Sequence, residues 1–540
     1  MSRAHDPRSD DPARPAPAGG RAADTGRPFE PRAAWLMLAV ITMGTTMVSL
    51  DGTIVLLAQP ALQADLNASL VQVQWVTAAY VLAVGALLIV SGGIGDRIGN
   101  RLTFLIGVTG FAVSSGLIAA AHDAGWLIGL RVLQGVSGAV LQPSTMGLLR
   151  ESFPEDRLDM PIAVRSASIG ISTAAGPVIG GLLVEHVSWR AAFLINIPLG
   201  LLTVALGAWV WRGRPARRPA PAARRSFDVP GALILGLLLC ALFLDVSAIA
   251  ARGVTDGRSV ALTVATTVLA WLFVRRERRA VDPLVPPTLL ASPPLWAGFV
   301  LVISLAFTMI GTLFVVSYYV QNHLGLHPVE GGVHVLPLTG TLIVAAPLSG
   351  IAMRKVGARA VVCAGLAVTA GAVYGLSRIG TQPGSTHLGL LLFALGLGLA
   401  PALAGSTKMI VSQVPVPLGG LAGGLHQTGM QIGSGIGIAT MGTMLGSRAE
   451  DLLRTALRQA GADDADPRFV RQALDEVSVG LHQPLAHMPA GLRGTWEGLS
   501  RSIFMDAMSY ALLAGVIATC VGLAVTAPSL LTELRDRKAR

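Results

Sequence analysis

Two charged residues lie inside long apolar segments of this chain, where charge is costly. Asp51 follows Leu50 in the first apolar segment, and Arg131 lies in the fourth. A carboxylate among hydrocarbon must face a partner or water, and an arginine cannot shed its charge there. At a rise of about 1.5 Å per residue, Asp51 lies roughly 24 Å from the inner surface and Arg131 about 10 Å below the outer one. An ion pair between them is therefore our hypothesis.

A carboxyl group in this position can exchange a proton for a cationic ligand. An apolar medium favours the neutral form of the group, and a nearby cation favours the charged form. Asp51 is thus predicted to carry protons, the alternative being a structural acid near the outer mouth. For Arg131 the alternative is snorkelling of its side chain to the interface. His426 could also titrate near neutrality, but a packed, hydrogen-bonded histidine fits that position equally well.

A second feature is an apolar segment from about 162 to 184, which is expected to form a helix with one face lined by glycines. Small residues let another helix approach closely, and a proline inside a helix bends or weakens it. The pattern predicts a surface on which two bundles seal or rock, with ordinary helix packing as the alternative. The residues concerned are Gly170, Gly176, Pro177, Gly180 and Gly181.

A short polar loop between the second and third apolar segments carries a third cluster, made of Gly92, Asp96, Arg97, Gly99 and Arg101. Gly99 permits a tight turn of the backbone. Asp96 is expected near the start of the following helix, where exposed amides and the helix dipole favour a carboxylate. The two arginines would pair with it or with lipid phosphates. We expect a latch between helices, and a simple topogenic loop is the alternative.

The composition places these residues in a polytopic membrane protein. The 540-residue chain is 52% hydrophobic and 13% charged, whereas soluble proteins carry about a quarter charged residues. Its net charge of +10 resides largely in short loops, which is the positive-inside pattern and argues against nucleic acid as a partner. The three cysteines lie in apolar segments without metal-ligand spacing, so no metal is expected. No phosphate-binding loop is present, and no cofactor is expected beyond the proton gradient.

We predict about fourteen membrane-spanning helices of roughly twenty residues each. With an even number, the arginine-rich loops place both termini in the cytoplasm and the protein in the cell membrane as a multi-pass protein. The predicted units are a disordered cytoplasmic tail over 1–32, a six-helix bundle over 33–212, two inserted helices with basic linkers over 213–294, a six-helix bundle over 295–528 that contains an extracellular loop over 446–503, and a cytoplasmic tail over 529–540.

The chain also repeats itself. The loop at 92–101 and the loop at 350–359 share glycine at their first and eighth positions and end in the same residue type, arginine, although the second has Arg354 in place of Asp96. Repeats that face the same side indicate two parallel halves related by an axis along the membrane normal. Substrate is then expected between the halves, near the middle of the membrane.

Together these motifs resemble the major facilitator superfamily. The 92–101 loop resembles its cytoplasmic signature, which helps to hold one of two alternating states, and the glycine-rich fifth segment resembles its antiporter motif. The Arg131-x-x-Gln134 pattern resembles a signature linked to proton transfer, which adds Gln134 to the site. The stretch around Asp51 is similar to that of the fourteen-span drug/proton antiporters (the EmrB/QacA type), although Leu56 replaces an asparagine common there.

The resemblance implies an all-α transporter, not an enzyme, that exports small hydrophobic or cationic compounds in exchange for protons. Its partners would be the substrate, protons and the lipid bilayer, and we expect a monomer. An exporter dedicated to one endogenous metabolite or antibiotic is the first alternative. A membrane receptor or scaffold without transport is the second, and the repeated loops argue against it.

Overall fold

The computed structural model describes residues 31–154, 157–212, 228–280, 283–284, 289, 292–381, 385–414, 419–460, 462, 466–482, 488, 492 and 494–539. The long elements in this part of the chain are all helical. They are α1 (Pro31–Leu66), α2 (Leu70–Ile98), α3 (Asn100–Ala119), α4 (Ala124–Ser152), α5 (Asp159–His186), α6 (Ala191–Leu194), α7 (Asn196–Trp211), α8 (Val229–Arg252), α9 (Gly257–Arg279), α11 (Pro293–Tyr318), the π-helix η3 (Tyr319–His323), α12 (Pro328–Val356), α13 (Ala358–Ser377), α14 (Ser385–Val411), α15 (Gly419–Gln459), α16 (Pro467–Val477) and α17 (Trp496–Ala539).

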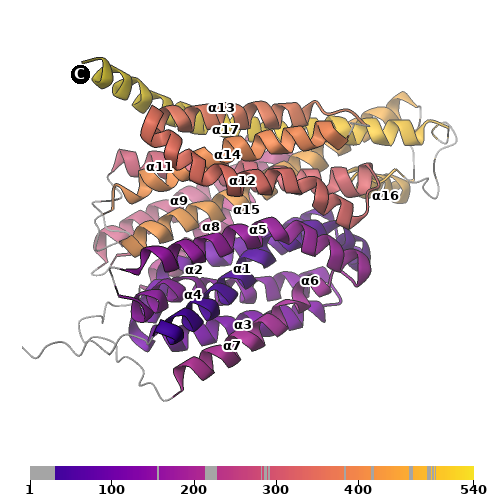
Figure 1. Ribbon diagram of the computed structural model, residues 1–540. Helices are drawn as coiled ribbons and strands as arrows, with labels where there is room; N and C mark the ends of the chain where they lie inside the picture. The colour runs from indigo at the N-terminus through magenta and orange to yellow at the C-terminus, as the bar shows by residue number, and fades with distance from the viewer. Residues whose placement is uncertain are drawn as a thin grey trace, which may run out of the picture.

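The helices form two bundles that lie side by side (Figure 1). In the first bundle α2 and α3 pack on α4, and α1 packs on α5. In the second, α12 and α13 pack on α14, and α11 and α13 pack on α17. The bundles meet along two helix pairs, α2 with α15 and α5 with α12. A ligand held between the bundles would therefore touch helices from both halves of the sequence.

The two ends of the molecule need names. We call the end at which α1 and α5 finish and α12 begins the distal end, and the opposite end the proximal end. The distal end carries α16 and lies at the right of Figure 1. The sequence predicts that the distal end faces the outside.

Thirteen of the described helical segments are long and apolar enough to cross a membrane. The predicted thirteenth span falls on α15, which is 41 residues long but is not among those segments. This helix is rich in glycine and polar residues and packs against α2, α11 and α17. The exact number of fourteen spans stays a prediction.

The inserted pair of helices, α8 and α9, covers the junction of α2 and α15. Leu239 and Phe243 of α8 are buried with Leu82 of α2 and Ile432 of α15. At the proximal end, Asp228 caps the start of α8 and binds Arg276 of α9, with Arg276 Nη2 at 2.8 Å from its Oδ1. The pair therefore contacts both halves at one of their two shared seams.

Two single glycines confirm the structural equivalence of the repeated loops. Gly99 lies between α2 and α3 with φ of +89°, and Gly357 lies between α12 and α13 with φ of +109°. Residues that carry a side chain rarely adopt this backbone conformation, which explains why glycine occupies both positions. Gly99 is thus the tight turn that the sequence predicts.

The expected position of Asp96 is wrong. The residue lies in the last turn of α2, because the helix runs on to Ile98 and ends only at the positive φ of Gly99. Carboxylates are not favoured by the dipole at that end of a helix. The side chains of Gly92, Asp96 and Arg97 lie outside the described part of the chain, so their predicted role as a latch stays a prediction.

Two described residues nearby do join helices at the proximal end. Asn100 at the start of α3 donates from Nδ2 to Oε1 of Glu151 near the end of α4, over 2.8 Å. The guanidinium of Arg101 lies over the ring of Trp211, 5.9 Å from its centroid. These two contacts connect helices at this loop. Arg101 was selected from the sequence, whereas Asn100 and Glu151 were not.

The glycines of α5 serve two neighbours. Gly176 and Gly180 face α1, where an added Cβ would overlap Thr53 and would approach Ile54 Cα to 3.2 Å. Gly181 faces the start of α12, and an added Cβ there would lie 2.8 Å from Val329 Cα. Gly170 has more room, since the nearest neighbour of an added Cβ would be 3.9 Å away. The predicted close apposition is thus present from Gly176 onward: Gly176 and Gly180 pack within the first bundle, and Gly181 meets the other half at the distal end.

The segment predicted as an extracellular loop continues the fold of the second bundle. Leu453 and Leu457 extend α15 and are buried in the core of that bundle. Beyond α16, the imidazole of His482 contacts that of His323 at the end of η3, with 2.9 Å between His482 Nε2 and His323 Nδ1. The ring of His323 also stacks on Phe504, at a centroid distance of 5.3 Å.

Replacing Gly181 with alanine should prevent closure at the distal end, because the new methyl group meets backbone atoms of α12 that cannot give way. Spin labels at Val187 and Val333 should report a longer distance in Gly181→Ala than in the wild type. Gly340→Ala on α12 is the matched control, since an added Cβ there has no neighbour within 4 Å. Equal distances in all three proteins would contradict the assignment of Gly181 to this seal.

Acidification should loosen the segment that carries α16. Burial, and after it His323 and the charge of Arg501, lower the pKa of His482 to about 4. When the segment detaches, the pKa returns to about 6.5, so the detached form binds protons first. The stabilisation is complete above about pH 6.5 and declines as the pH falls towards 4. Hydrogen exchange of α16, corrected for intrinsic rates, should show more frequent opening as the pH falls from 6.5 towards 4. His482→Gln should remove this contribution and leave only the opposite response of Asp475 and Glu476, whose pKa values burial raises. The same pH response of opening in the wild type and in His482→Gln would refute the role of His482.

Candidate functional site

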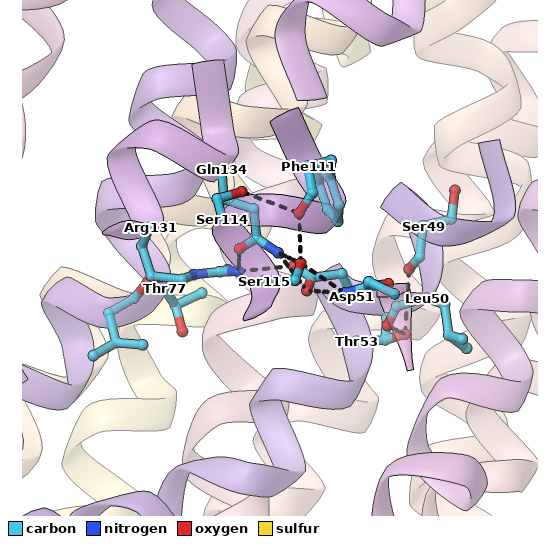
Figure 2. Close-up of polar contacts among 12 residues, drawn as sticks. Ser49, Leu50, Asp51, Thr53, Thr77, Phe111, Ser114, Ser115, Arg131 and Gln134 are labelled. Atoms are coloured by element: carbon cyan, nitrogen blue, oxygen red, sulfur yellow. Dashed lines mark hydrogen bonds and ion pairs between the residues drawn. The ribbon is translucent and has the colours of Figure 1, made fainter. Parts of the chain in front are cut away.

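Asp51 and Arg131 form a fully buried ion pair between α1 and α4 (Figure 2). The Nη1 atom of Arg131 lies 2.7 Å from Oδ2 of Asp51, and both side chains have 0% exposure. The pair that the sequence suggested is therefore present in the structure. Snorkelling is excluded for Arg131, because no part of its side chain reaches the surface.

Polar side chains from three further positions complete the shell of Asp51. Its Oδ1 accepts from Nε2 of Gln134 over 3.0 Å and from Nδ2 of Asn196 on α7 over 3.1 Å. Both amides also donate to the hydroxyl of Ser115 on α3, over 2.8 and 3.2 Å. That hydroxyl donates in turn to the carbonyl of Phe111. Four helices thus hold one carboxylate, with hydrogen-bond donors to both of its oxygens.

Arg131 is held as tightly as its partner. Its Nε donates to the carbonyl of Val76 on α2 over 3.0 Å, and Nη1 also donates to Oε1 of Gln134. The ring of Tyr80 lies against the guanidinium, 4.2 Å from Cζ to the centroid, and that of Phe193 lies 5.7 Å away. Aromatic faces stabilise a desolvated cation. Among the described residues, Nη2 has no hydrogen-bond partner.

The chemistry of this arrangement follows from its charge balance. As long as Asp51 is ionised, the pair is neutral and can remain in a low-dielectric interior. A proton on Asp51 would leave Arg131 as an uncompensated charge, which is strongly unfavourable in such a place. Binding of a proton must therefore be accompanied by a rearrangement of the surrounding helices. This is the property that a proton-driven conformational change requires.

The predicted site residues do not all meet. Gln134 is part of the network, but His426 belongs to the other half, where its Nε2 lies 3.0 Å from the hydroxyl of Thr407 on α14. Ser115 and Asn196 were not selected from the sequence. Asn196 is a polar residue in an otherwise apolar stretch, two positions before Pro198, which was a usable signal, whereas Ser115 is one of many serines in apolar segments.

A cavity of about 40 Å³ lies between the halves. Helices α1, α5, α11 and α12 contribute to its wall. Its polar lining residues are Thr53, Thr173, Ser317, Gln321 and Thr339, and the others are apolar, proline or glycine. No lining residue is ionisable. Thr53 faces the cavity and Asp51, two positions earlier on α1, faces the interior of the first bundle.

Comparisons with known proteins agree with this fold and site. Residues 35–438 match the model of the Major Facilitator Superfamily, so the chain belongs to that family. A solved bacterial homologue of the human lysosomal transporter Spinster, in an inward-facing and occupied conformation, superposes with a TM-score of 0.62 at 15% identity, covering 94% of this chain and 99% of that one. The predicted all-helical transporter fold is confirmed, and the chain is a multi-pass membrane protein rather than an enzyme.

Two curated relatives are exporters or resistance proteins. The tetracenomycin C resistance and export protein of Streptomyces glaucescens is 41% identical over 507 residues, which cover 94% of this chain and 93% of that protein. The methyl viologen resistance protein SmvA of Salmonella typhimurium (strain LT2) is 30% identical over 414 residues, covering 76% of this chain and 82% of the relative. Similarity to the first therefore extends over nearly the whole chain.

Removing one member of the buried pair should destabilise the protein more than removing both. Asp51→Asn leaves the charge of Arg131 uncompensated, and Arg131→Gln leaves Asp51 unpaired. Each should lower the free energy of unfolding by about 3–5 kcal/mol, whereas the double variant removes both charges. Thermal unfolding of the purified protein should give a clearly higher midpoint for the double variant than for Arg131→Gln alone. A loss of stability in the double variant equal to the sum of the two single losses would show that the two charges are not coupled.

Proposed function

We propose that this chain exports small hydrophobic organic compounds across the cell membrane in exchange for protons. The observation that carries the proposal is the neutral, fully buried Asp51–Arg131 pair, in a chain that also holds an apolar cavity between its two halves. The named functions of the relatives, resistance and export, support the direction of transport. The charge balance of the pair supports proton coupling, since protonation of Asp51 would leave the charge of Arg131 unpaired unless the helices rearrange.

The arginine-rich loops support an orientation in which both termini face the cytoplasm and the distal end faces outside. In that orientation, the structure is the state in which the outer end is closed. Protons from outside would reach Asp51 and favour opening of that end and release of the compound. Loss of the proton to the cytoplasm would restore the pair and permit reloading. The proton gradient is the only energy source that this cycle needs.

The lining of the cavity, which must widen to admit a compound of this kind, favours uncharged cargo over cationic cargo. Its described lining has no carboxylate to balance a positive charge. Glu330, which precedes the lining residue Gly331, is exposed, and Asp51 is already neutralised by Arg131. Burying an unpaired cation in an apolar medium is costly. Threonine, serine and glutamine side chains instead offer hydrogen bonds to carbonyl and hydroxyl groups.

A second candidate is an exporter dedicated to one antibiotic or metabolite. It is favoured by the extent of similarity to a relative named for a single compound, tetracenomycin C. The two candidates share the mechanism and differ only in how many compounds the cavity accepts.

A susceptibility panel in a pump-deficient host tests the proposal. Expression of the wild-type chain should raise the inhibitory concentration of tetracenomycin C, which carries no permanent charge, several-fold more than that of methyl viologen, a dication. Asp51→Asn should abolish the protection, because asparagine can neither neutralise Arg131 nor take up a proton. Thr308→Val, which removes a buried hydroxyl contact to Thr519 in the second bundle, is the matched control and should keep it.

Each outcome has a definite meaning. Protection against many unrelated uncharged compounds favours the multidrug exporter, and protection against one favours the dedicated exporter. Preferential protection against methyl viologen would contradict the uncharged cargo. Full protection by Asp51→Asn at equal expression would contradict proton coupling through this residue.

A further inference from the structure

Polar side chains continue from the buried ion pair towards the distal end of the first bundle. Gln59 lies on α1 eight residues beyond Asp51, which is about 12 Å further along the helix. It is fully buried, and its Nε2 donates to the hydroxyl of Thr77 on α2 over 2.8 Å. Its Oε1 has no hydrogen-bond partner among the described residues. A glutamine in this surrounding needs an explanation, because apolar neighbours on both helices are fully buried: Leu62 one turn beyond Gln59 on α1, and Val73 one turn before Thr77 on α2.

Thr77 links Gln59 to the pair itself. It directly follows Val76, whose carbonyl accepts from Nε of Arg131, and Figure 2 shows Thr77 beside the arginine side chain. The polar groups of α1 and α2 thus approach the guanidinium from its distal side. One helical turn separates Thr77 from Tyr80, whose ring covers the guanidinium.

Gln74 carries the polar path to the seam between the halves. It lies one turn before Thr77 on α2 and is 2% exposed. Its amide lies against Gly442 of α15, where an added Cβ would be 2.8 Å from Gln74 Cδ. Its Nε2, like Oε1 of Gln59, has no partner within the described part of the chain. Two amides with an unused polar atom each therefore flank Thr77.

The path also has an outlet. Gln63, one turn beyond Gln59 on α1, is half-buried, and its Oε1 accepts from the hydroxyl of Tyr318 on α11 over 2.9 Å. Unused polar atoms of buried side chains are normally satisfied by ordered water, which bridges two to four such groups. Gln59 lies on α1 between the half-buried Gln63 and the buried Asp51, and Gln74 lies on the partner helix α2. The unused atoms of these two glutamines are a suitable support for bound water.

We propose that Gln59, Thr77 and Gln74 hold water molecules through which protons from the distal end reach Asp51. The proposal rests on the proposed proton-coupled function. A hydronium ion at the distal end gives up a proton, each water passes one on as it receives one, and the last O–H bond forms on a carboxylate oxygen of Asp51. The amides and the hydroxyl keep their protons and position the water. The ionisable side chains that face Asp51 in the described structure are Arg131 and Tyr80.

The test follows protonation of Asp51 directly, in the purified full-length protein in lipid vesicles. The carboxyl C=O band of protonated Asp51 is identified in infrared difference spectra by its loss in Asp51→Asn. After a rapid drop in pH, Gln59→Leu and Gln74→Leu should delay the appearance of this band at least ~10-fold, as expected when the water that transfers the proton is no longer held in position. The pH at which the band is half-formed should not change, because neither variant alters a charge. Gln59→Ser, which leaves space and a hydroxyl for water, should restore most of the rate.

Gln74→Leu is the safer variant for folding, because its Nε2 makes no hydrogen bond to lose. Thr308→Val is the control for loss of a buried polar contact elsewhere and should leave the rate unchanged. Unchanged rates in Gln59→Leu and Gln74→Leu, with normal titration of Asp51 in the wild type, would overturn the water path and leave the proposed function intact. A wild-type protein whose Asp51 never becomes protonated would overturn both.

Discussion

A carboxylate and a guanidinium buried together in an apolar interior impose the constraint on which this structure depends. Each charge is tolerable only because the other lies 2.7 Å away and because two side-chain amides and a backbone carbonyl saturate most of the remaining atoms. The requirement fixes the relative positions of α1, α2, α3, α4 and α7. The same requirement explains Gln134, Asn196 and Ser115. The two amides donate to the carboxylate of Asp51, and Ser115 accepts from both amides.

Helix α1 connects this pair to the seam between the halves. One of its faces presents Asp51 to the first bundle, and another lies against the glycines of α5, where Gly176 and Gly180 leave room for Thr53 and Ile54. Thr53 also lines the cavity between the halves. A change in the charge of Asp51 therefore acts on the same helix that forms the cavity wall and supports α5, which in turn seals the distal end against α12. These few contacts are sufficient to couple proton binding to a conformational change.

The sequence was sufficient for the fold and for the centre of the site. Intramembrane charge is so costly that Asp51 and Arg131 could be paired by height alone, and repeated glycines revealed the two halves. The polar shell was less accessible, because Ser115 differs in no local way from other serines and is selected only by the packing of α3 on α4. Asp96 was misplaced because the end of α2 depends on the φ of Gly99, not on the start of the polar loop. His426 stays a prediction, since its hydrogen bond to Thr407 reveals no connection to the pair.

The central claim is that the charge of Asp51 sets the conformational state. It is tested most directly by spin-label distances across the distal ends of α5 and α12, measured in lipid over a range of pH without substrate. The account predicts that the distribution shifts towards longer distances as the pH falls in the wild type, and that it no longer responds to pH in Asp51→Asn. The same pH response in both proteins would contradict it.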